Sequence, residues 1–250
     1  GKVQFSGTKT LTGRELEEGQ FSFTLTDGEK TETVKNDKDG NFTFTEITYD
    51  ETMLGEHTYT VTEVNDGKPG YTYDDAEYEI IVKVEDNGDG TLNVTYTVNG
   101  EENGAITFEN EYKANGSVEF GGTKTLTGRD LAAYEFSFEL IAADGNYKGF
   151  TKNDADGSYE FAPIRYTQED AGKTFNYTVT EVNGGKPGYT YDDTEYEIIV
   201  KVEDNGDGTL NVTYTVNGEE NGAITFENEY KAEGKVQFSG TKTLTGRELE

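Results

Sequence analysis

The sequence predicts an all-β protein built from tandem β-sandwiches. Three observations lead there: apolar and polar residues alternate in short runs rich in Val, Ile, Thr, Tyr and Phe, turn residues such as the 31 glycines separate these runs, and no run has a convincing helical period. A hydrophobic content of 32%, with 17 Tyr and 14 Phe, suffices for modest sandwich cores. Two small domains therefore fit the 250 residues better than one large domain.

Internal repetition sets the domain organisation. Two segments recur: residues 71–114 at 189–232 with the single change of Ala76 to Thr194, and residues 1–17 loosely at 116–131 and without change at 234–250. We therefore predict a first domain over 1–114, a second over 115–232, and the truncated start of a third repeat over 233–250. The last segment is too short to bury a core alone, so we expect it to be disordered or to pair with a neighbouring strand.

Alternation within the first repeat predicts seven strands. They lie near residues 2–11, 20–26, 41–47, 57–64, 77–86, 91–98 and 105–112. The connections 37–41 and 86–91 carry Asp-Gly pairs, which permit the positive φ that tight hairpins need. Seven strands in about 110 residues are typical of an immunoglobulin-like sandwich. The segments joining the repeats are very short, so we expect the domains to be arranged end to end as a semi-rigid rod.

Charge and composition exclude several classes of function. The formal net charge of −29 repels nucleic-acid phosphates and anionic membrane surfaces, and no segment has the apolar length of a membrane span. We therefore expect neither nucleic-acid binding nor membrane insertion. The chain has no Cys, so a disulfide, a thiol nucleophile and a thiolate metal site are all excluded.

The sequence predicts no cofactor and no metal site. The acidic turn at 85–90 resembles a calcium loop only superficially, because it begins with Glu85 and has Tyr96 where the bidentate glutamate of an EF-hand should be. Hairpin turns are the simpler interpretation. His57 is the only histidine and Phe175 takes its place in the second repeat, so a reaction common to both repeats cannot use histidine. We expect His57 to pack in a partly exposed position.

Three polar residues in each repeat fall in phase with the apolar residues that should face the core. In the first repeat Lys9 follows the phase of Phe5, Glu63 that of Val61, and Asn110 that of Phe108. The second repeat has the same trio, Lys124, Glu181 and Asn228. We therefore expect an amine, a carboxyl group and a carboxamide to face inward in each domain.

A buried amine beside a buried carboxyl group favours a covalent reaction with the carboxamide. Desolvation lowers the pKa of the amine and raises that of the acid, so the pair can be neutral. A neutral Lys9 can attack the Asn110 carbonyl carbon while Glu63 donates a hydrogen bond to the carbonyl oxygen and passes a proton to the departing ammonia. Two alternatives stay open from the residues alone: an unreacted hydrogen-bonded network, or bulges that turn these side chains to solvent.

The motifs around the trio carry a family resemblance. TKTLTGREL with its lysine, YTVTE with its glutamate and FENEY with its asparagine resemble the streptococcal pilin isopeptide linkage domain (FctA-like), which is related to the Cna protein B-type domains of Gram-positive surface proteins. The resemblance covers both complete repeats. It implies CnaB-like sandwiches in which Glu63 and Glu181 are the catalytic proton shuttles for isopeptide bonds that cross-link Lys9 to Asn110 and Lys124 to Asn228.

The resemblance implies a structural stalk or spacer of a bacterial cell-surface adhesin or pilin. We expect an extracellular protein, anchored to the cell wall in its full-length form, that contacts neighbouring repeats of its own chain and reaches a host-surface ligand through other domains. The cross-linking is autocatalytic and single-turnover, so the chain is not predicted to be an enzyme. Lys242 repeats Lys9, but no corresponding Glu or Asn follows it, so we expect it to remain a free amine. The alternatives are a ligand-binding adhesin module and a polymerising pilus backbone subunit.

Overall fold

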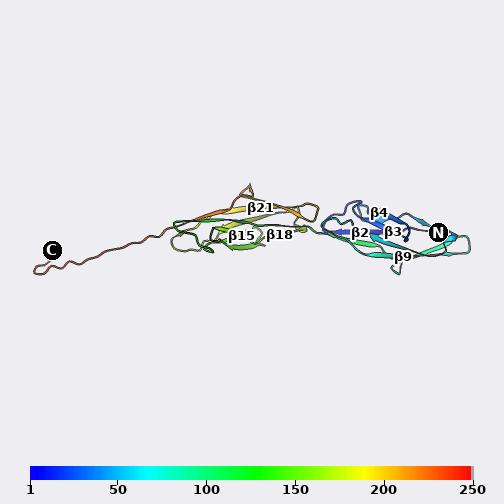
Figure 1. Cartoon of the computed structure of the whole chain (residues 1–250), viewed down its shortest axis with the longest axis horizontal. Helices are drawn as coiled ribbons and strands as arrows, with labels where there is room; N and C mark the ends of the chain where they lie inside the picture. The colour runs from blue at the N-terminus through cyan, green and yellow to red at the C-terminus, as the bar shows by residue number, and fades with distance from the viewer. Residues whose placement is uncertain (249–250) are drawn as a thin grey trace. The chain divides into compact units, whose positions relative to one another are not determined.

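The structure, a computed structural model, describes residues 1–248. Its regular elements are β-strands and two short 3-10 turns, so the predicted all-β class is confirmed for the described chain. Two compact units form. One comprises Gly1–Val118, Ile164–Lys173 and Lys201–Thr213, and the other comprises Glu119–Pro163, Thr174–Val200 and the described residues from Tyr214 on. In Figure 1 the labelled strands β2, β3, β4 and β9 belong to the first repeat, and β15, β18 and β21 belong to the second.

The first repeat is a sandwich of a six-stranded and a four-stranded sheet. The larger sheet has the order β11-β10-β9-β7-β3-β4 and the smaller one β5-β2-β12-β8, while β1 pairs separately with β6. The elements are β1 (Lys2–Val3), β2 (Ser6–Thr12), β3 (Ser22–Thr26), β4 (Thr31–Lys35), β5 (Asn41–Thr43), β6 (Ile47–Thr48), η1 (Glu51–Met53), β7 (Gly55–Glu63), β8 (Tyr71–Thr72), β9 (Glu77–Asp86), β10 (Leu92–Val98), β11 (Glu101–Glu102) and β12 (Thr107–Tyr112).

The second repeat has the same two-sheet arrangement. Its sheets have the orders β16-β15-β19-β21-β22-β23 and β17-β14-β24-β20, and β13 pairs with β18. The elements are β13 (Asn115–Val118), β14 (Gly121–Thr127), β15 (Ser137–Ala142), β16 (Lys148–Lys152), β17 (Ser158–Glu160), β18 (Ile164–Thr167), η2 (Gln168–Asp170), β19 (Thr174–Glu181), β20 (Tyr189–Thr190), β21 (Glu195–Asp204), β22 (Leu210–Val216), β23 (Glu219–Glu220) and β24 (Thr225–Tyr230).

Aromatic side chains join the two sheets of each sandwich. In the first repeat the rings of Phe23 and Phe42 stack with centroids 3.9 Å apart, and Phe108 stacks on Phe23 at 5.4 Å. All three are buried, as strand alternation requires for residues on the inner faces. Stacked aromatic pairs contribute about 0.5–1.5 kcal/mol beyond the burial of their area, so this cluster fixes the spacing at which the sheets face each other.

The first and last long strands of each repeat are parallel neighbours. β2 pairs with β12 and β14 with β24, both in parallel register, whereas their other partners are antiparallel. A parallel pairing places the start of the first strand and the end of the last strand at opposite ends of the pair. Force applied through the two ends of a repeat therefore shears this pair.

Two sequence predictions need correction. The segment 37–41 does not close a hairpin, because it connects β4 of the larger sheet to β5 of the smaller one. The predicted first strand, 2–11, is divided into β1 and β2, which belong to different sheets. The 86–91 connection does join antiparallel neighbours, and Asp89 accepts the N–H and hydroxyl of Thr91 within it, as expected of a hairpin turn.

The segment that repeats the start of the chain has no strand where the structure describes it. Residues 231–248, which include Lys242, are all exposed and without strand assignment. Figure 1 draws this segment without strand arrows. Residues 249–250 of the predicted third repeat, 233–250, lie outside the described chain. Among residues 1–248 no helix is long and apolar enough to cross a membrane.

Candidate functional site

The predicted trio of the first repeat meets between the two sheets. Lys9 lies on β2 opposite Phe108, and Asn110 lies on β12 opposite Leu11. The two polar side chains are therefore diagonal neighbours on the inner face of the four-stranded sheet. Glu63 ends β7 in the facing sheet. The side chains of Lys9 and Glu63 are fully buried, and Asn110 is 2% exposed, so the predicted inward orientation is confirmed.

A tight backbone approach holds Lys9 in place. Its main-chain N–H donates to the carbonyl of Gly40 at 2.7 Å. Gly40 has a φ of +87°, and a Cβ there would lie 2.1 Å from the carbonyl oxygen of Lys9. Only glycine accommodates both the conformation and the contact. On the core side, the ring of Phe21 lies 4.9 Å from the Lys9 Nζ. The turn and the ring together leave the amine directed at Glu63.

Glu63 contacts both of the other side chains. Its Oε2 accepts from the Lys9 Nζ at 2.8 Å, and its Oε1 accepts from the Asn110 Nδ2 at 2.8 Å. One carboxyl group thus bridges the amine and the amide nitrogen. In an attack on the carboxamide the Lys9 amine would lose a proton, and the Asn110 nitrogen would gain one as it leaves. This is the geometry that proton transfer between them requires.

The carbonyl oxygen of Asn110 has a different partner from the one predicted. It accepts from the main-chain N–H of Asp74 at 2.7 Å, instead of from Glu63. With its oxygen bound to the backbone, the carboxamide turns its nitrogen towards the glutamate. Sequence reasoning did not find Asp74, because the contact is made by a main-chain group that every non-proline residue carries.

The second repeat reproduces this arrangement closely. The Lys124 Nζ lies 2.7 Å from the Glu181 Oε2, and the Asn228 Nδ2 donates to the Glu181 Oε1 at 2.6 Å. The Asn228 Oδ1 accepts from the main-chain N–H of Asp192 at 2.8 Å. The side chains of Lys124 and Glu181 are fully buried. Phe136 lies under the amine at 4.9 Å, as Phe21 does in the first repeat.

Burial shifts both ionisable groups of each trio towards neutrality. Desolvation lowers the pKa of Lys9 and raises that of Glu63, and their mutual hydrogen bond and attraction act in the opposite direction without reversing either shift. The pKa of Lys124 is lowered and that of Glu181 raised for the same reason. A lowered amine pKa provides the unprotonated nucleophile, and a raised carboxyl pKa provides the proton donor.

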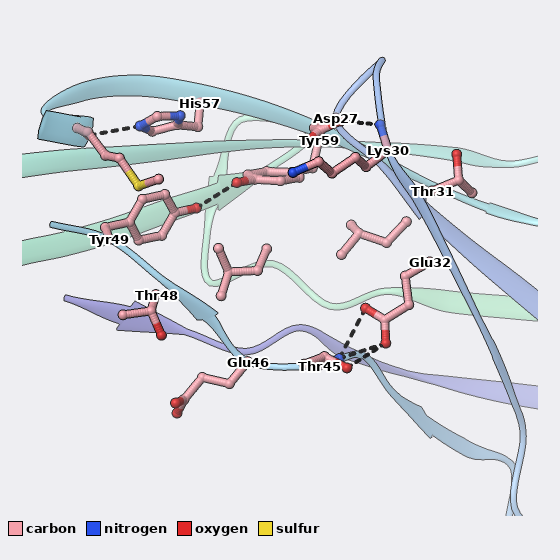
Figure 2. Close-up of a pocket in the computed structure, with 13 residues that line it drawn as sticks. Asp27, Lys30, Thr31, Glu32, Thr45, Glu46, Thr48, Tyr49, His57 and Tyr59 are labelled. Carbon is pink, nitrogen blue, oxygen red and sulfur yellow. Dashed lines mark hydrogen bonds between the residues drawn. The ribbon is translucent and has the colours of Figure 1, made fainter.

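A surface pocket of about 430 Å³ is present in the first repeat. Figure 2 shows that its polar groups bind one another: Tyr49 and Tyr59 share a hydroxyl hydrogen bond of 2.9 Å, and Glu32 accepts from Thr45. His57 bonds the Met53 carbonyl through Nε2 at 2.8 Å and is partly exposed, as predicted. These groups are satisfied within the protein, so they do not indicate a ligand.

The lining of the pocket differs between the repeats. Lys30 at its rim holds the same hairpin position as Tyr147, whose ring contacts Tyr177 in the second repeat. The buried trio is the chemical feature that both repeats share. Within residues 1–248 no group of three or more His, Cys, Asp or Glu side chains is placed to hold a metal ion.

Comparison with known proteins identifies one family. Residues 5–113 and 120–231 each match the family described as Spy0128-like isopeptide containing domain, FctA. The chain is similar to the major pilin of Streptococcus pyogenes, with 19% identity over 92% of this chain and 98% of that chain and a TM-score of 0.34. It is also similar to a C-terminal fragment of the pilus adhesin SpaC of Lactobacillus rhamnosus GG, with 17% identity, 94% and 100% coverage and a TM-score of 0.36. No curated protein matches.

Proposed function

Because the chain belongs to the Spy0128-like isopeptide containing domain family, we propose that each repeat cross-links itself and acts as a covalently locked spacer. The resemblance predicted from the sequence is thereby confirmed. Membership of this family supports a structural role in pili or other surface proteins. The family is structural and not one of catalytic enzymes. Within that role we propose Lys9–Asn110 and Lys124–Asn228 bonds in domains spanning 1–114 and 115–232.

The observation that carries the proposal is the bridging carboxyl group in both repeats. The Lys9 Nζ attacks the Asn110 Cγ, the bond from Cγ to Nδ2 breaks, and ammonia leaves. Glu63 gives its proton to the departing nitrogen and receives one from the attacking amine, so it ends the reaction in the form in which it began. The fold holds all three groups in contact, which removes most of the entropic barrier to such a reaction.

The topology supports a load-bearing use of the bond. Lys9 and Asn110 lie on the parallel strands β2 and β12, which a pull on the ends of the repeat would shear. A covalent bond between them would carry the load directly and leave residues 10–109 out of the force path. We propose that this makes each repeat inextensible, as a spacer between a cell surface and another domain requires. We assign neither cell-wall anchoring nor a host-ligand site to these two repeats.

Peptide mapping tests the proposal. Digestion of the chain should yield branched peptides in which Lys9 is joined to Asn110 and Lys124 to Asn228, each lighter by one ammonia. Glu63→Ala should abolish only the first and Glu181→Ala only the second. Glu109→Ala is the matched control, because Glu109 adjoins Asn110 with its side chain exposed, and both branched peptides should persist. Unbranched peptides from the parent chain would refute the proposal.

The two alternatives predict other results. A ligand-binding adhesin module should bind a ligand through the separately folded repeats, irrespective of the Glu63→Ala and Glu181→Ala changes. A polymerising pilus backbone subunit should form covalent ladders when a sortase-type transpeptidase is supplied. A chain that binds no ligand in the first assay, forms no ladder in the second and carries the internal cross-links supports the spacer function.

A further inference from the structure

The backbone N–H that binds each reactive carboxamide belongs to an aspartate whose carboxylate accepts two main-chain hydrogen bonds. Asp74 follows β8, and its own N–H donates to the Asn110 Oδ1 at 2.7 Å. Its carboxylate accepts two further main-chain N–H groups, that of Glu109 on Oδ2 at 2.7 Å and that of Ala76 on Oδ1 at 2.9 Å. Glu109 precedes Asn110 on β12. The Asp74 carboxylate is thus hydrogen-bonded to β12, the strand of the reactive residue, and the Asp74 N–H is hydrogen-bonded to the reacting oxygen.

The second repeat has the same three contacts. Asp192 donates its N–H to the Asn228 Oδ1 at 2.8 Å, and its carboxylate accepts the N–H of Glu227 at 2.8 Å and of Thr194 at 2.9 Å. The residue two positions on differs, Ala76 against Thr194. The Thr194 hydroxyl adds a hydrogen bond to the Asp192 Oδ1 at 2.6 Å, yet the three main-chain contacts are the same. The contacts therefore depend on the aspartate itself.

Attack on the carboxamide places negative charge on the carbonyl oxygen. A pre-positioned N–H donor that already contacts this oxygen stabilises the developing charge, and removing one such donor elsewhere typically costs about 10²–10³ in rate. The donor must not move away as the oxygen becomes anionic. Two hydrogen bonds to the carboxylate, one of them to the neighbour of Asn110, tie the position of the Asp74 N–H to the strand that carries the oxygen.

We propose that the main-chain N–H groups of Asp74 and Asp192 are oxyanion donors for the two cross-linking reactions, and that their carboxylates are positioning groups for those donors. This inference rests on the proposed function. The N–H stabilises the tetrahedral intermediate formed when the Lys9 Nζ adds to the Asn110 Cγ. It is released unchanged when the bond to Nδ2 breaks and ammonia leaves with the proton supplied by Glu63.

The negative charge of Asp74 is not by itself the explanation. That charge raises the pKa of Glu63, which favours its role as proton donor, but it also raises the pKa of Lys9, which disfavours the neutral nucleophile. These two effects on the reaction oppose each other. The hydrogen bonds of the Asp74 carboxylate, in contrast, act in one direction only: they hold the N–H donor in place and so favour the reaction.

The test is the rate of ammonia loss in each repeat after cell-free synthesis of the full chain, followed by timed quenching and peptide mass spectrometry. Asp74→Ala should slow the Lys9–Asn110 bond by about tenfold or more and leave the Lys124–Asn228 bond at its parent rate, and Asp192→Ala should do the reverse. Asp75→Ala is the matched control, because Asp75 is the exposed neighbour in the same loop, and it should leave both rates unchanged.

Hydrogen exchange of the β12 amides separates slow chemistry from poor folding. The inference predicts that unreacted Asp74→Ala chains protect the β12 amides as unreacted Lys9→Met chains do, except the Glu109 amide, which loses its acceptor on Asp74. Asp74→Asn retains one acceptor oxygen, so it should fold and react at an intermediate rate. A parent rate in both variants, or a slowing fully explained by loss of β12 protection in both, would overturn the inference. A parent chain with no bonds would instead refute the proposed function.

Discussion

A tyrosine hydroxyl is buried without a partner in the second repeat, and the first repeat supplies its control. Tyr159 and Phe42 occupy equivalent positions. Tyr159 stacks on Phe138 with centroids 3.8 Å apart and an interplanar angle of 14°, and Phe42 stacks on Phe23 at 3.9 Å and 10°. Tyr159 is 2% exposed, and its hydroxyl has no hydrogen-bond partner among the described residues. The repeats therefore differ by one buried polar group at the same ring position.

Tyr159→Phe should stabilise the second repeat. An unsatisfied buried hydroxyl costs about 1–3 kcal/mol, and the ring packing of Phe42 shows that phenylalanine fits this position. The reverse change, Phe42→Tyr, should destabilise the first repeat by a similar amount. A Cβ on Gly7 would lie 2.3 Å from the Phe42 Cζ, so a new hydroxyl would point into a backbone with little space to move. For a domain of this size, 1 kcal/mol corresponds to a shift of roughly 4 °C in Tm.

Differential scanning calorimetry of the full chain measures both changes. We expect the transition of the second repeat to rise by about 4 °C or more in Tyr159→Phe and that of the first repeat to fall in Phe42→Tyr. The unchanged repeat in each variant is an internal reference. A lower Tm for Tyr159→Phe would mean that the hydroxyl is satisfied in solution, and the argument from its burial would be wrong.

Three further predictions concern the reaction and the strands that hold it. Bond formation should have a bell-shaped pH dependence in timed mass spectrometry: it should slow in acid as Lys9 becomes protonated and slow in alkali as Glu63 loses its proton, so a rate that rises steadily with pH would contradict the neutral pair. Gly40→Ala should destabilise the first repeat more than Gly28→Ala in thermal unfolding, because both residues have a positive φ but only Gly40 contacts the Lys9 carbonyl; equal effects would show that the contact is unimportant. In single-molecule pulling, Glu63→Ala should release about 100 residues, roughly 340 Å of chain, whereas the parent's first repeat should release none.

Strand alternation was sufficient to predict the buried trio. Lys9 and Asn110 follow the phase of Phe5 and Phe108, and all four are buried. The phase of a strand depends only on the alternation of side chains across it, so it survives the division of the first predicted strand into β1 and β2. Phase could not predict the contacts between the sheets, which depend on how β7 faces the smaller sheet.

The elements that sequence reasoning missed have weak or short patterns. β4 is an edge strand whose five residues are alternately exposed and half-buried, so no apolar face distinguishes it from a loop. β8 and β11 have two residues each, too few for a period. The position of Asp74 could not be predicted either, because it depends on a main-chain hydrogen bond between segments 36 residues apart.

The cross-links themselves are the central claim, and their chemical balance makes them directly measurable. Each bond expels one ammonia, and linking the ends of a loop of about 100 residues should stabilise a repeat by roughly 4.7 kcal/mol on the chain-entropy estimate used for disulfides. The decisive measurement is the intact mass of the fully denatured chain, beside Glu63→Ala and Glu181→Ala. We predict a deficit of two ammonia molecules in the parent chain and of one in each variant. A parent mass equal to that of the unmodified sequence would contradict the account.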